Sequence, residues 1–414
     1  MTALKTIFRS ALFLLVPVAV AAQDTAVFVH GAWKDAMIMA KQQNKPVFVD
    51  LWFLGCMPCK RMVDETFAQK DVAAYMNANF ICYKSDINVE MDGKLLSRKY
   101  GASGFPHYLY INPDGSLIEA GSGFMGAPRF LENLKTVVAN GKAGKVKKFS
   151  NSMDITYPEV YNDLYFKKPT EQSPNRKELI NKWMAEQKDL SSELSYLMMV
   201  RGFGALDEQY ASYFIDHAVE LANAYGARQV GTTVYTRLSK KAGELGSKKD
   251  KAAFEALVAK VKPVYDAHDW KIFGKIISEA YYKNTGDYSV YANFIETSGF
   301  YTLADKASFA GKTAELVKGN KALLARLDSW MSENEINNQS KYALEGLYYT
   351  KAVVKYFLDN NEEAKKYLEA ANKAALSPKS ANREGIDGLS VALGAGKKDF
   401  SPKAPYVMVP LTMD

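Results

Sequence analysis

The chain has 414 residues, which is enough for two or three domains. Its formal net charge is +7, with 53 basic and 46 acidic residues. No recognisable nucleic-acid-binding module accompanies this mild positive surplus, so nucleic-acid binding is not expected.

Residues 1–22 have the features of a secretory signal peptide. Lys5 and Arg9 precede an apolar run, 11–22, that ends in small residues. The run is too short and too early in the chain for a membrane span, and no cysteine follows it to carry a lipid. We therefore expect an exported protein, soluble after cleavage and located in a bacterial periplasm. An uncleaved membrane anchor is the alternative.

A strand-like run, 46–52, gives way to a helix-like stretch at two cysteines that lie three positions apart, Cys56 and Cys59. At the start of a helix this spacing lets the two thiols close a disulfide, and the first cysteine faces unpaired backbone N–H groups. The helix dipole and the cations Lys60 and Arg61 should favour the Cys56 thiolate, which is the nucleophilic form. This pattern predicts a redox-active dithiol in which Cys59 is the buried, resolving thiol.

Two other interpretations of the cysteine pair stay open, namely half of a zinc site and an inert disulfide. A zinc site needs about four ligands, but the chain adds only Cys82 and four scattered histidines, none of them paired at ligand spacing. Because these ligands are missing, we expect no metal. An inert disulfide is less expected because structural disulfides usually close longer loops. Cys82 lies in a β-rich run and is expected to be a small buried hydrophobe, with a regulatory or intermolecular role as the alternative.

The rest of the first third alternates between helix-like and strand-like segments. A proline, Pro106, precedes an aromatic and β-branched run, which is compatible with an edge strand or a cis peptide bond. The turn signal at 112–115 predicts a hairpin. The expected helices are 60–67, 71–79, 93–100 and the amphipathic 127–139, and the expected strands are 80–84, 108–111 and 117–120.

From about residue 32 to about residue 139, these motifs resemble the thioredoxin superfamily in order and spacing. The matching segments are 49–52 followed by 56–60, the segment 100–106 that would carry the cis-proline, and the turn at 114–115. The stretch 33–46 further resembles the thioredoxin-like tail domains of membrane disulfide reductases and their exported relatives. The resemblance implies an α/β domain with a central mixed sheet flanked by helices.

The resemblance also implies roles for individual residues. Cys56 would be the attacking thiolate and Cys59 the resolving thiol, while Asp50 would be a buried carboxylate that takes up the proton of Cys59. A desolvated carboxylate has a raised pKa and can exchange a proton near neutrality, which agrees with that role. A core aspartate without catalytic use is the alternative. Lys84 resembles the lysine that accompanies this aspartate.

A protein substrate is implied by the segment around the expected cis-proline. In the family, the proline, here Pro106, lies against the dithiol, and the backbone just before it, here that of Phe105, pairs with an extended strand of the substrate. Pairing of main chain with main chain gives affinity without sequence specificity, so a protein is expected rather than a small molecule. Trp52, Met57 and Pro58 complete the expected substrate-binding residues. No cofactor is expected beyond the redox-active disulfide itself.

Two positions that border the substrate surface depart from the pattern of the family. Gly55 stands where close relatives of thioredoxin have a tryptophan, and His107 follows the proline in place of a small hydroxyl residue. Target choice is therefore less certain than the core chemistry. His107 could tune the dithiol by its charge or be a partly buried neutral histidine.

The residues between the two cysteines favour a reducing dithiol. Met57 and Pro58 carry no ionisable group, so we expect a potential nearer roughly −270 mV than roughly −120 mV, with isomerase-like values in between still open. In an oxidising compartment, a reducing dithiol must receive electrons from elsewhere. A membrane disulfide reductase is the implied electron donor.

The chain beyond residue 140 has a different character. Residues 141–148 are rich in glycine and lysine and predict a flexible linker. Helical patterns then dominate, and the segments 280–288 and 354–364 look alike. Gly286 and Asp359 within them are 73 residues apart, close to two periods of the roughly 34-residue tetratricopeptide unit. Helical hairpins of this kind stack into a surface that holds a peptide or protein, but an irregular bundle is equally compatible with the pattern.

The sequence thus predicts an α/β thioredoxin-like domain followed by an all-α helical-hairpin or repeat domain. The expected divisions are a signal peptide (1–22), the thioredoxin-like domain (23–140), a linker (141–153), the helical domain (154–398) and a tail (399–414). We expect an exported thiol:disulfide oxidoreductase that reduces disulfides of exported proteins. The alternatives are a binding or assembly protein with an inert or locking dithiol, and a disulfide isomerase or oxidant.

Overall fold

The computed structural model describes residues 25–396 and 401–408, and the chain divides into two compact units. The predicted signal peptide lies outside the described residues, as do residues 399–400 and 409–414 of the predicted tail. Each unit draws on more than one stretch of sequence. The first comprises Met1–Leu95, Gly104–Ile118 and Gly123–Val146, and the second comprises Leu96–Ser103, Glu119–Ser122 and Lys147–Asp414. The domain boundaries expected from the sequence stay predictions.

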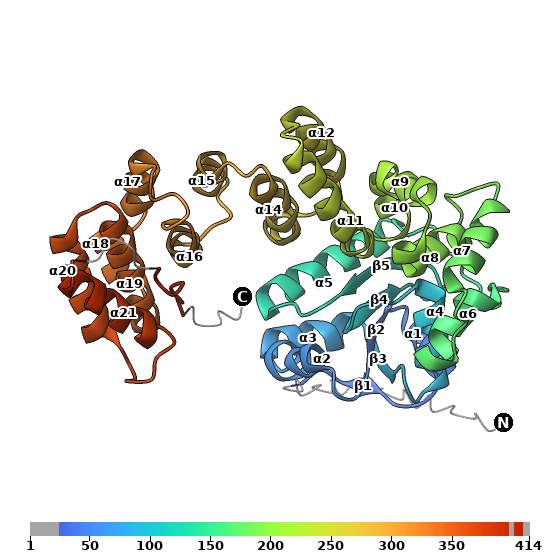
Figure 1. The fold of residues 1–414 in the computed structure, drawn as a ribbon. Helices are drawn as coiled ribbons and strands as arrows, with labels where there is room; N and C mark the ends of the chain where they lie inside the picture. Colours follow the sequence, from blue (N-terminus) through green and yellow to red (C-terminus); the bar gives the residue numbers. More distant parts are fainter. Residues whose placement is uncertain (1–24, 397–400, 409–414) are drawn as a thin grey trace, which may run out of the picture. The chain divides into compact units, whose positions relative to one another are not determined.

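A five-stranded mixed sheet forms the middle of the first unit, with its strands in the order β1-β3-β2-β4-β5 (Figure 1). β2 pairs in parallel with β3 and antiparallel with β4, and β3 pairs in parallel with β1. The expected mixed central sheet is therefore confirmed. The strands are β1 (Phe28–Val29), β2 (Val47–Trp52), β3 (Ile81–Asp86), β4 (His107–Ile111) and β5 (Leu117–Ser122).

Helices flank this sheet near the predicted positions. The expected helix at 60–67 begins earlier, because α2 (Met57–Arg61) runs directly into a π-helical segment, Met62–Phe67. The other helices are α1 (Trp33–Gln43), α3 (Lys70–Asn79), α4 (Met91–Tyr100) and α5 (Ala127–Lys142), the last of which continues three residues beyond its predicted end. The predicted hairpin is present, with Gly115 at a φ of 91° in the turn between β4 and β5.

An aromatic core covers one face of the sheet. Successive side chains of a strand point to opposite faces, so Phe48 of β2 shares a face with Tyr108 and Tyr110 of β4. These rings pack with Phe67 and Phe130, which come from the π-helical segment and from α5. Asp50 lies two residues after Phe48 and therefore points to this same face, the one that carries the π-helical segment.

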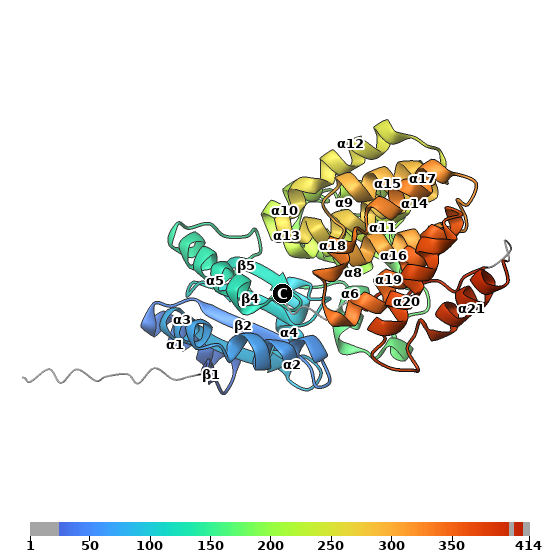
Figure 2. The same ribbon diagram turned by 90° about the vertical axis from the view of Figure 1, so that its left-hand side faces the viewer.

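The second unit is helical throughout its larger part, as the sequence predicts (Figure 2). Its core centres on α19, where Leu347, Tyr349 and Val353 are completely buried. The helices are α6 (Glu159–Phe166), α7 (Arg176–Ala185), α8 (Glu193–Gly202), α9 (Glu208–Asp216), α10 (Ala218–Tyr225), α11 (Ala227–Ser247), α12 (Lys251–Val261), α13 (Ala267–Asp269), α14 (Lys275–Asn284), α15 (Tyr288–Thr297), α16 (Leu303–Thr313), α17 (Lys321–Ser329), α18 (Glu333–Asn337), α19 (Lys341–Phe357), α20 (Asn361–Ala374) and α21 (Arg383–Gly394). Shorter turns are the 3-10 segments Pro169–Glu171, Phe203–Ala205 and Lys262–Val264 and the π-helical segment Trp270–Gly274.

The two look-alike segments of the sequence form corners of the same local geometry. Gly286 and Asp359 have φ angles of 67° and 61°, in the left-handed region. The next residue in each case, Asp287 or Asn360, caps the following helix by accepting a hydrogen bond from a backbone N–H. A shared corner accounts for the resemblance between the segments, while a tetratricopeptide repeat stays a prediction.

The end of the glycine- and lysine-rich segment is ordered within the second unit. The Lys147 ammonium lies 3.0 Å from a carboxylate oxygen of Glu119, and the Lys148 N–H donates to the Ala224 carbonyl at 2.7 Å. Phe149 is buried against the rings of Tyr100, Tyr196 and Tyr225. These contacts hold residues 147–149 within the second unit, while the flexible linker expected at 141–153 stays a prediction.

None of the helices in the described ranges is both long and apolar enough to cross a membrane.

Candidate redox site

The two cysteines of the motif form a disulfide where β2 gives way to α2. Cys56 is the N-cap residue of α2, and Cys59 lies in its first turn, with 5.3 Å between their Cα atoms. The Cys59 N–H donates a hydrogen bond to the Cys56 sulfur at 3.2 Å. Backbone donors at the start of a helix stabilise negative charge. The geometry therefore places the sulfur of Cys56 where a thiolate is favoured.

The backbone conformation at position 55, rather than a lack of space around it, explains why the residue is glycine. Its φ is 92°, a conformation that side chains with a Cβ rarely adopt, and no atom lies within 4 Å of the position that a Cβ would take. The Cys56 N–H donates to the Phe53 carbonyl at 3.1 Å across this tight turn. Glycine lets the chain turn sharply from the strand into the helix that carries the dithiol.

Asp50 occupies a buried position between two polar neighbours on adjacent strands. The sheet register pairs Asp50 with Lys84 of β3 on one side and with Tyr108 of β4 on the other. Only 3% of Asp50 is exposed, and its Oδ1 atom has no hydrogen-bond partner. Desolvation raises the pKa of Asp50 to about 7, and the positive charge of Lys84 opposes part of that rise.

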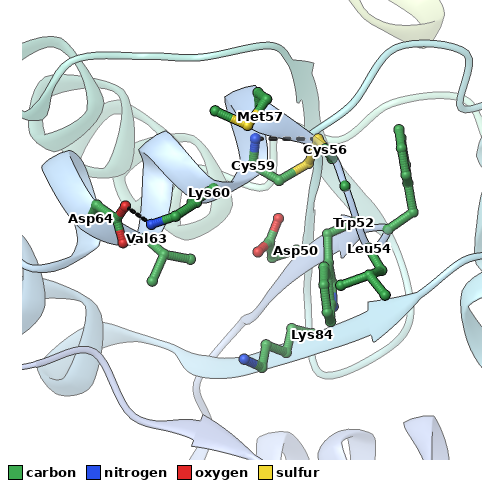
Figure 3. A pocket seen from close by; sticks show the side chains of 12 residues that line it. Asp50, Trp52, Leu54, Cys56, Met57, Cys59, Lys60, Val63, Asp64 and Lys84 are labelled. Atoms are coloured by element: carbon green, nitrogen blue, oxygen red, sulfur yellow. Dashed lines mark hydrogen bonds and ion pairs between the residues drawn. A yellow bond between two sulfur atoms is a disulfide. The ribbon is translucent and has the colours of Figure 1, made fainter.

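A cavity of about 290 Å³ brings the carboxylate and the dithiol together. Asp50, Cys56 and Cys59 all line it, and Figure 3 shows Asp50 between Cys59 and Lys84. The Lys84 ammonium also lies 5.8 Å from the centre of the Trp52 ring, which is close enough for a cation–π contact. A buried carboxylate whose pKa is raised to about 7 thus shares one cavity with Cys56 and Cys59.

Exposed apolar side chains lie beside the dithiol, and two of them, Leu54 and Val63, were not expected from the sequence. Leu54, Met57 and Val63, which also line the cavity, are 85%, 66% and 50% exposed. The sequence could have indicated Leu54 and Val63, because both are apolar residues next to the predicted redox motif and neither belongs to a strand. Of the three, only Met57 was among the expected substrate-binding residues.

Of the remaining expected substrate-binding residues, Trp52 lines the cavity, whereas Phe105, Pro106 and Pro58 lie outside its lining. The peptide bond between Phe105 and Pro106 is cis, as the resemblance implies, and the Pro106 carbonyl accepts a hydrogen bond from the Gly123 N–H at 2.8 Å. The Phe105 ring packs edge-on against Phe53, with 5.6 Å between the ring centres, and Phe53 in turn lines the cavity. Pro58 is exposed in the first turn of α2.

Two further side chains considered in the sequence are buried. His107 is 2% exposed. Cys82 is also 2% exposed, and desolvation raises the pKa of its thiol to about 12, which suits the expected small hydrophobe. Within residues 25–396 and 401–408, no group of three or more histidine, cysteine, aspartate or glutamate side chains could hold a metal ion.

The sequence matches known proteins over the region that carries this site. Residues 33–138 match the family model described as a thioredoxin-like domain. The thiol:disulfide interchange protein DsbD of Yersinia pestis is 30% identical over 105 residues, which amount to 25% of this chain and 18% of DsbD. The uncharacterized protein B0495.5 of Caenorhabditis elegans is 28% identical over 116 residues, or 25% of this chain and 16% of that protein. The chain thus spans less than a fifth of the length of either relative.

Two solved structures are also similar to part of the chain. An oxidoreductase, DsbH, has 18% sequence identity and a TM-score of 0.26, and the match covers 32% of this chain and 95% of DsbH. A candidate disulphide-isomerase from Bacteroides thetaiotaomicron has 32% identity and a TM-score of 0.26, over 28% of this chain and 97% of that protein. On the mixed sheet, the dithiol at the start of α2 and the family match together, residues 33–138 form a thioredoxin-like domain, and a helical region follows it.

Proposed function

We propose that the chain is an exported thiol:disulfide oxidoreductase that reduces disulfides of exported proteins. The observation that carries the proposal is the shared cavity of Cys56, Cys59 and the buried Asp50, whose pKa is raised to about 7. The match to a thioredoxin-like domain and the similarity to a protein named for thiol:disulfide interchange support it. Export rests on the pattern of residues 1–22, and a periplasmic location follows from it.

The reaction begins from the reduced dithiol. The Cys56 thiolate attacks one sulfur of a substrate disulfide, so that a Cys56–substrate disulfide forms and the second substrate sulfur leaves as a thiolate. Asp50 accepts the proton of the Cys59 thiol, and the resulting Cys59 thiolate attacks the Cys56 sulfur. The substrate is released with two electrons gained, and the Cys56–Cys59 disulfide holds the oxidised state.

The electron donor closes the cycle. In an oxidising compartment the Cys56–Cys59 disulfide must be reduced again by another dithiol, and we assign this role to a membrane disulfide reductase. No bound cofactor is needed for the exchange, because every sulfur and proton in it belongs to one of the two proteins.

The exposed rim around the dithiol suits a polypeptide substrate. Leu54 and Met57 present apolar surface beside the reactive sulfur, and Phe105 connects the cis-proline segment with Phe53 of the cavity. An extended substrate strand could pair with the backbone before Pro106 and cover this apolar rim. Trp52 and Pro58 complete the proposed contact surface. Lys84, which lies below Asp50 in the view of Figure 3, offsets part of the rise in the pKa of Asp50 by its positive charge.

Trapping of mixed disulfides tests the proposal. Cys59→Ser should accumulate disulfide-linked complexes with exported proteins, because the variant can attack but cannot resolve, whereas Cys56→Ser should accumulate none. Complexes are measured on non-reducing gels and identified by mass spectrometry, with Cys82→Ser as the control that leaves trapping unchanged. If neither variant traps a partner and the wild-type chain does not reduce insulin, the dithiol is inert and the binding interpretation replaces the enzymatic one.

The redox potential separates a reductase from an oxidant. Equilibration of the Cys56–Cys59 pair with glutathione should give a value nearer roughly −270 mV than roughly −120 mV. A value near that of strong oxidants would rule out the reductase, and an intermediate value would favour an isomerase.

A further inference from the structure

Residues 401–408 form a segment without regular secondary structure that contacts α16, α19 and α21. Pro405 is buried, and Val407 packs against the core around α19. At the start of the segment, the Ser401 hydroxyl donates to a Glu315 carboxylate oxygen at 2.9 Å, and the Lys403 ammonium lies 2.5 Å from a Glu384 carboxylate oxygen. The segment is therefore held along its length rather than at one point.

Its main chain is recognised by side chains of the helices. Asn382 is 5% exposed and uses both ends of its amide on one residue, because its Nδ2 donates to the Tyr406 carbonyl at 2.8 Å and its Oδ1 accepts from the Tyr406 N–H at 2.7 Å. The Tyr349 hydroxyl donates to the Lys403 carbonyl at 2.9 Å. Such contacts hold an extended backbone whatever its side chains are.

Two helix glycines admit this backbone. A Cβ on Gly346 of α19 would lie 2.3 Å from the Tyr406 carbonyl oxygen, and a Cβ on Gly311 of α16 would lie 2.7 Å from the ring of Pro405. Glycine inside a helix is less favourable than alanine. Glycine therefore lowers the stability of α16 and α19 at the positions where the segment lies closest to them.

The segment itself specifies little beyond one buried position. Tyr406 and Met408 are 54% and 46% exposed, whereas Pro405 fills the space beside Gly311. An occupant of this groove needs an extended backbone and a proline or similarly compact residue at the buried position, and a basic residue two positions earlier adds an exposed ion pair with Glu384.

We propose that this groove, defined by Gly311, Gly346, Tyr349 and Asn382, is a binding site for extended polypeptide segments, and that residues 401–408 are its internal occupant. An external segment with a Lys-x-Pro pattern takes the same place when the internal segment leaves. The proposal does not depend on the dithiol, because every contact that carries it lies in the second unit. It gives the helical region a peptide ligand of stated chemistry.

A full-length chain with Pro405→Asp and Tyr406→Pro tests the proposal. The first change puts a carboxylate at the buried position and the second removes the N–H that Asn382 accepts, so the internal segment should leave while the groove stays intact. The probe is a fluorescein-labelled peptide with the wild-type sequence of residues 401–408. Fluorescence anisotropy should show at least ten-fold tighter binding to this variant than to the wild-type chain.

Two matched substitutions distinguish binding in the groove from non-specific binding of the peptide. Adding Asn382→Ala to the double variant should weaken peptide binding about ten-fold or more, since two hydrogen bonds are lost. Adding Asn361→Ala, an exposed residue on α20, should leave the affinity unchanged. Equal binding to the double variant and to the wild-type chain, or no binding to a double variant whose circular dichroism matches wild type, would overturn the proposal.

A second measurement uses the unaltered chain in case the double variant unfolds. The Tyr406 amide should be protected from hydrogen exchange, and excess labelled peptide should raise its exchange rate several-fold by displacing the internal segment. The fluorescein tag distinguishes the probe from the chain in mass spectrometry. Unchanged exchange at saturating peptide would contradict exchangeable occupancy.

Discussion

Among the charged side chains of the described residues, Asp50 is the least exposed in the first unit and Lys99 in the second, and the two units provide for these charges in opposite ways. Asp50 in the first unit is 3% exposed, and its Oδ1 atom has no hydrogen-bond partner. Lys99 in the second unit is 1% exposed, and its ammonium donates to a Glu193 carboxylate oxygen at 2.6 Å and to the Ser150 hydroxyl at 2.9 Å. Glu193 accepts a further bond from the Ser150 N–H at 2.7 Å.

The two groups differ in what opposes the cost of burying their charge. Burial disfavours the charged form of either group, so it lowers the pKa of Lys99 and raises that of Asp50. Glu193 offsets part of the shift of Lys99 by a direct hydrogen bond and by its charge, whereas Lys84 offsets part of the shift of Asp50 by its charge alone. A buried carboxylate left under-compensated beside a disulfide is the arrangement expected of a proton acceptor.

Removing the partner of Lys99 should have the largest effect on stability. Glu193→Ala leaves a buried ammonium without its counter-charge, which typically costs about 3–5 kcal/mol. Glu159→Ala is the matched control, because Glu159 also occupies the first position of a helix but is 87% exposed in its side chain. Urea denaturation should show a large loss for the first variant and little change for the second. Equal losses would mean that the Lys99–Glu193 pair is not the stabilising element.

Asp50→Asn should remove the loss of folding stability that ionisation of Asp50 causes as the pH rises. The pKa of about 7 in the folded state lies above the ordinary 3.8, so the native state binds more protons than the unfolded state between these values, and stability falls as the pH rises from about 4 to about 7. The free energy of unfolding of Asp50→Asn, relative to wild type, should therefore rise by about 2–4 kcal/mol from pH 4 to pH 8.

The exposed Asp64→Asn is the control for this series and should show no such rise relative to wild type. A flat difference between Asp50→Asn and wild type across the same range would mean that Asp50 titrates at an ordinary value.

The same variant should also lose part of its chemistry. Without a carboxylate to take the Cys59 proton, resolution of the mixed disulfide should slow by about 100-fold near pH 7. The pH profile of insulin reduction should also lose its inflection near pH 7, a signature that a purely structural role of Asp50 would not remove. The rate is measured by stopped-flow mixing of the reduced enzyme with a disulfide peptide. An unchanged rate and profile would leave Asp50 without a catalytic part.

Sequence reasoning reached the site of Asp50 but not that of Lys99, for a physical reason. Asp50, the dithiol and the cis-proline segment are recognisable because each sits in a local pattern of strand, turn or helix start. Lys99 and Glu193 are 94 positions apart in the sequence, so no local sequence pattern predicts their ion pair. Phe149 escaped notice in the same way, since its burial depends on rings that come from distant helices.

The smallest expected effect comes from the second partner of Lys99. Ser150→Ala removes the hydroxyl that Lys99 contacts but keeps the backbone N–H that Glu193 accepts, so the ion pair should survive with a loss of about 1 kcal/mol. Ser247→Ala, which removes an exposed hydroxyl bonded only within its own helix, is the control and should change the urea midpoint less. A loss for Ser150→Ala as large as that for Glu193→Ala would show that the hydroxyl, rather than the opposite charge, makes burial of Lys99 tolerable.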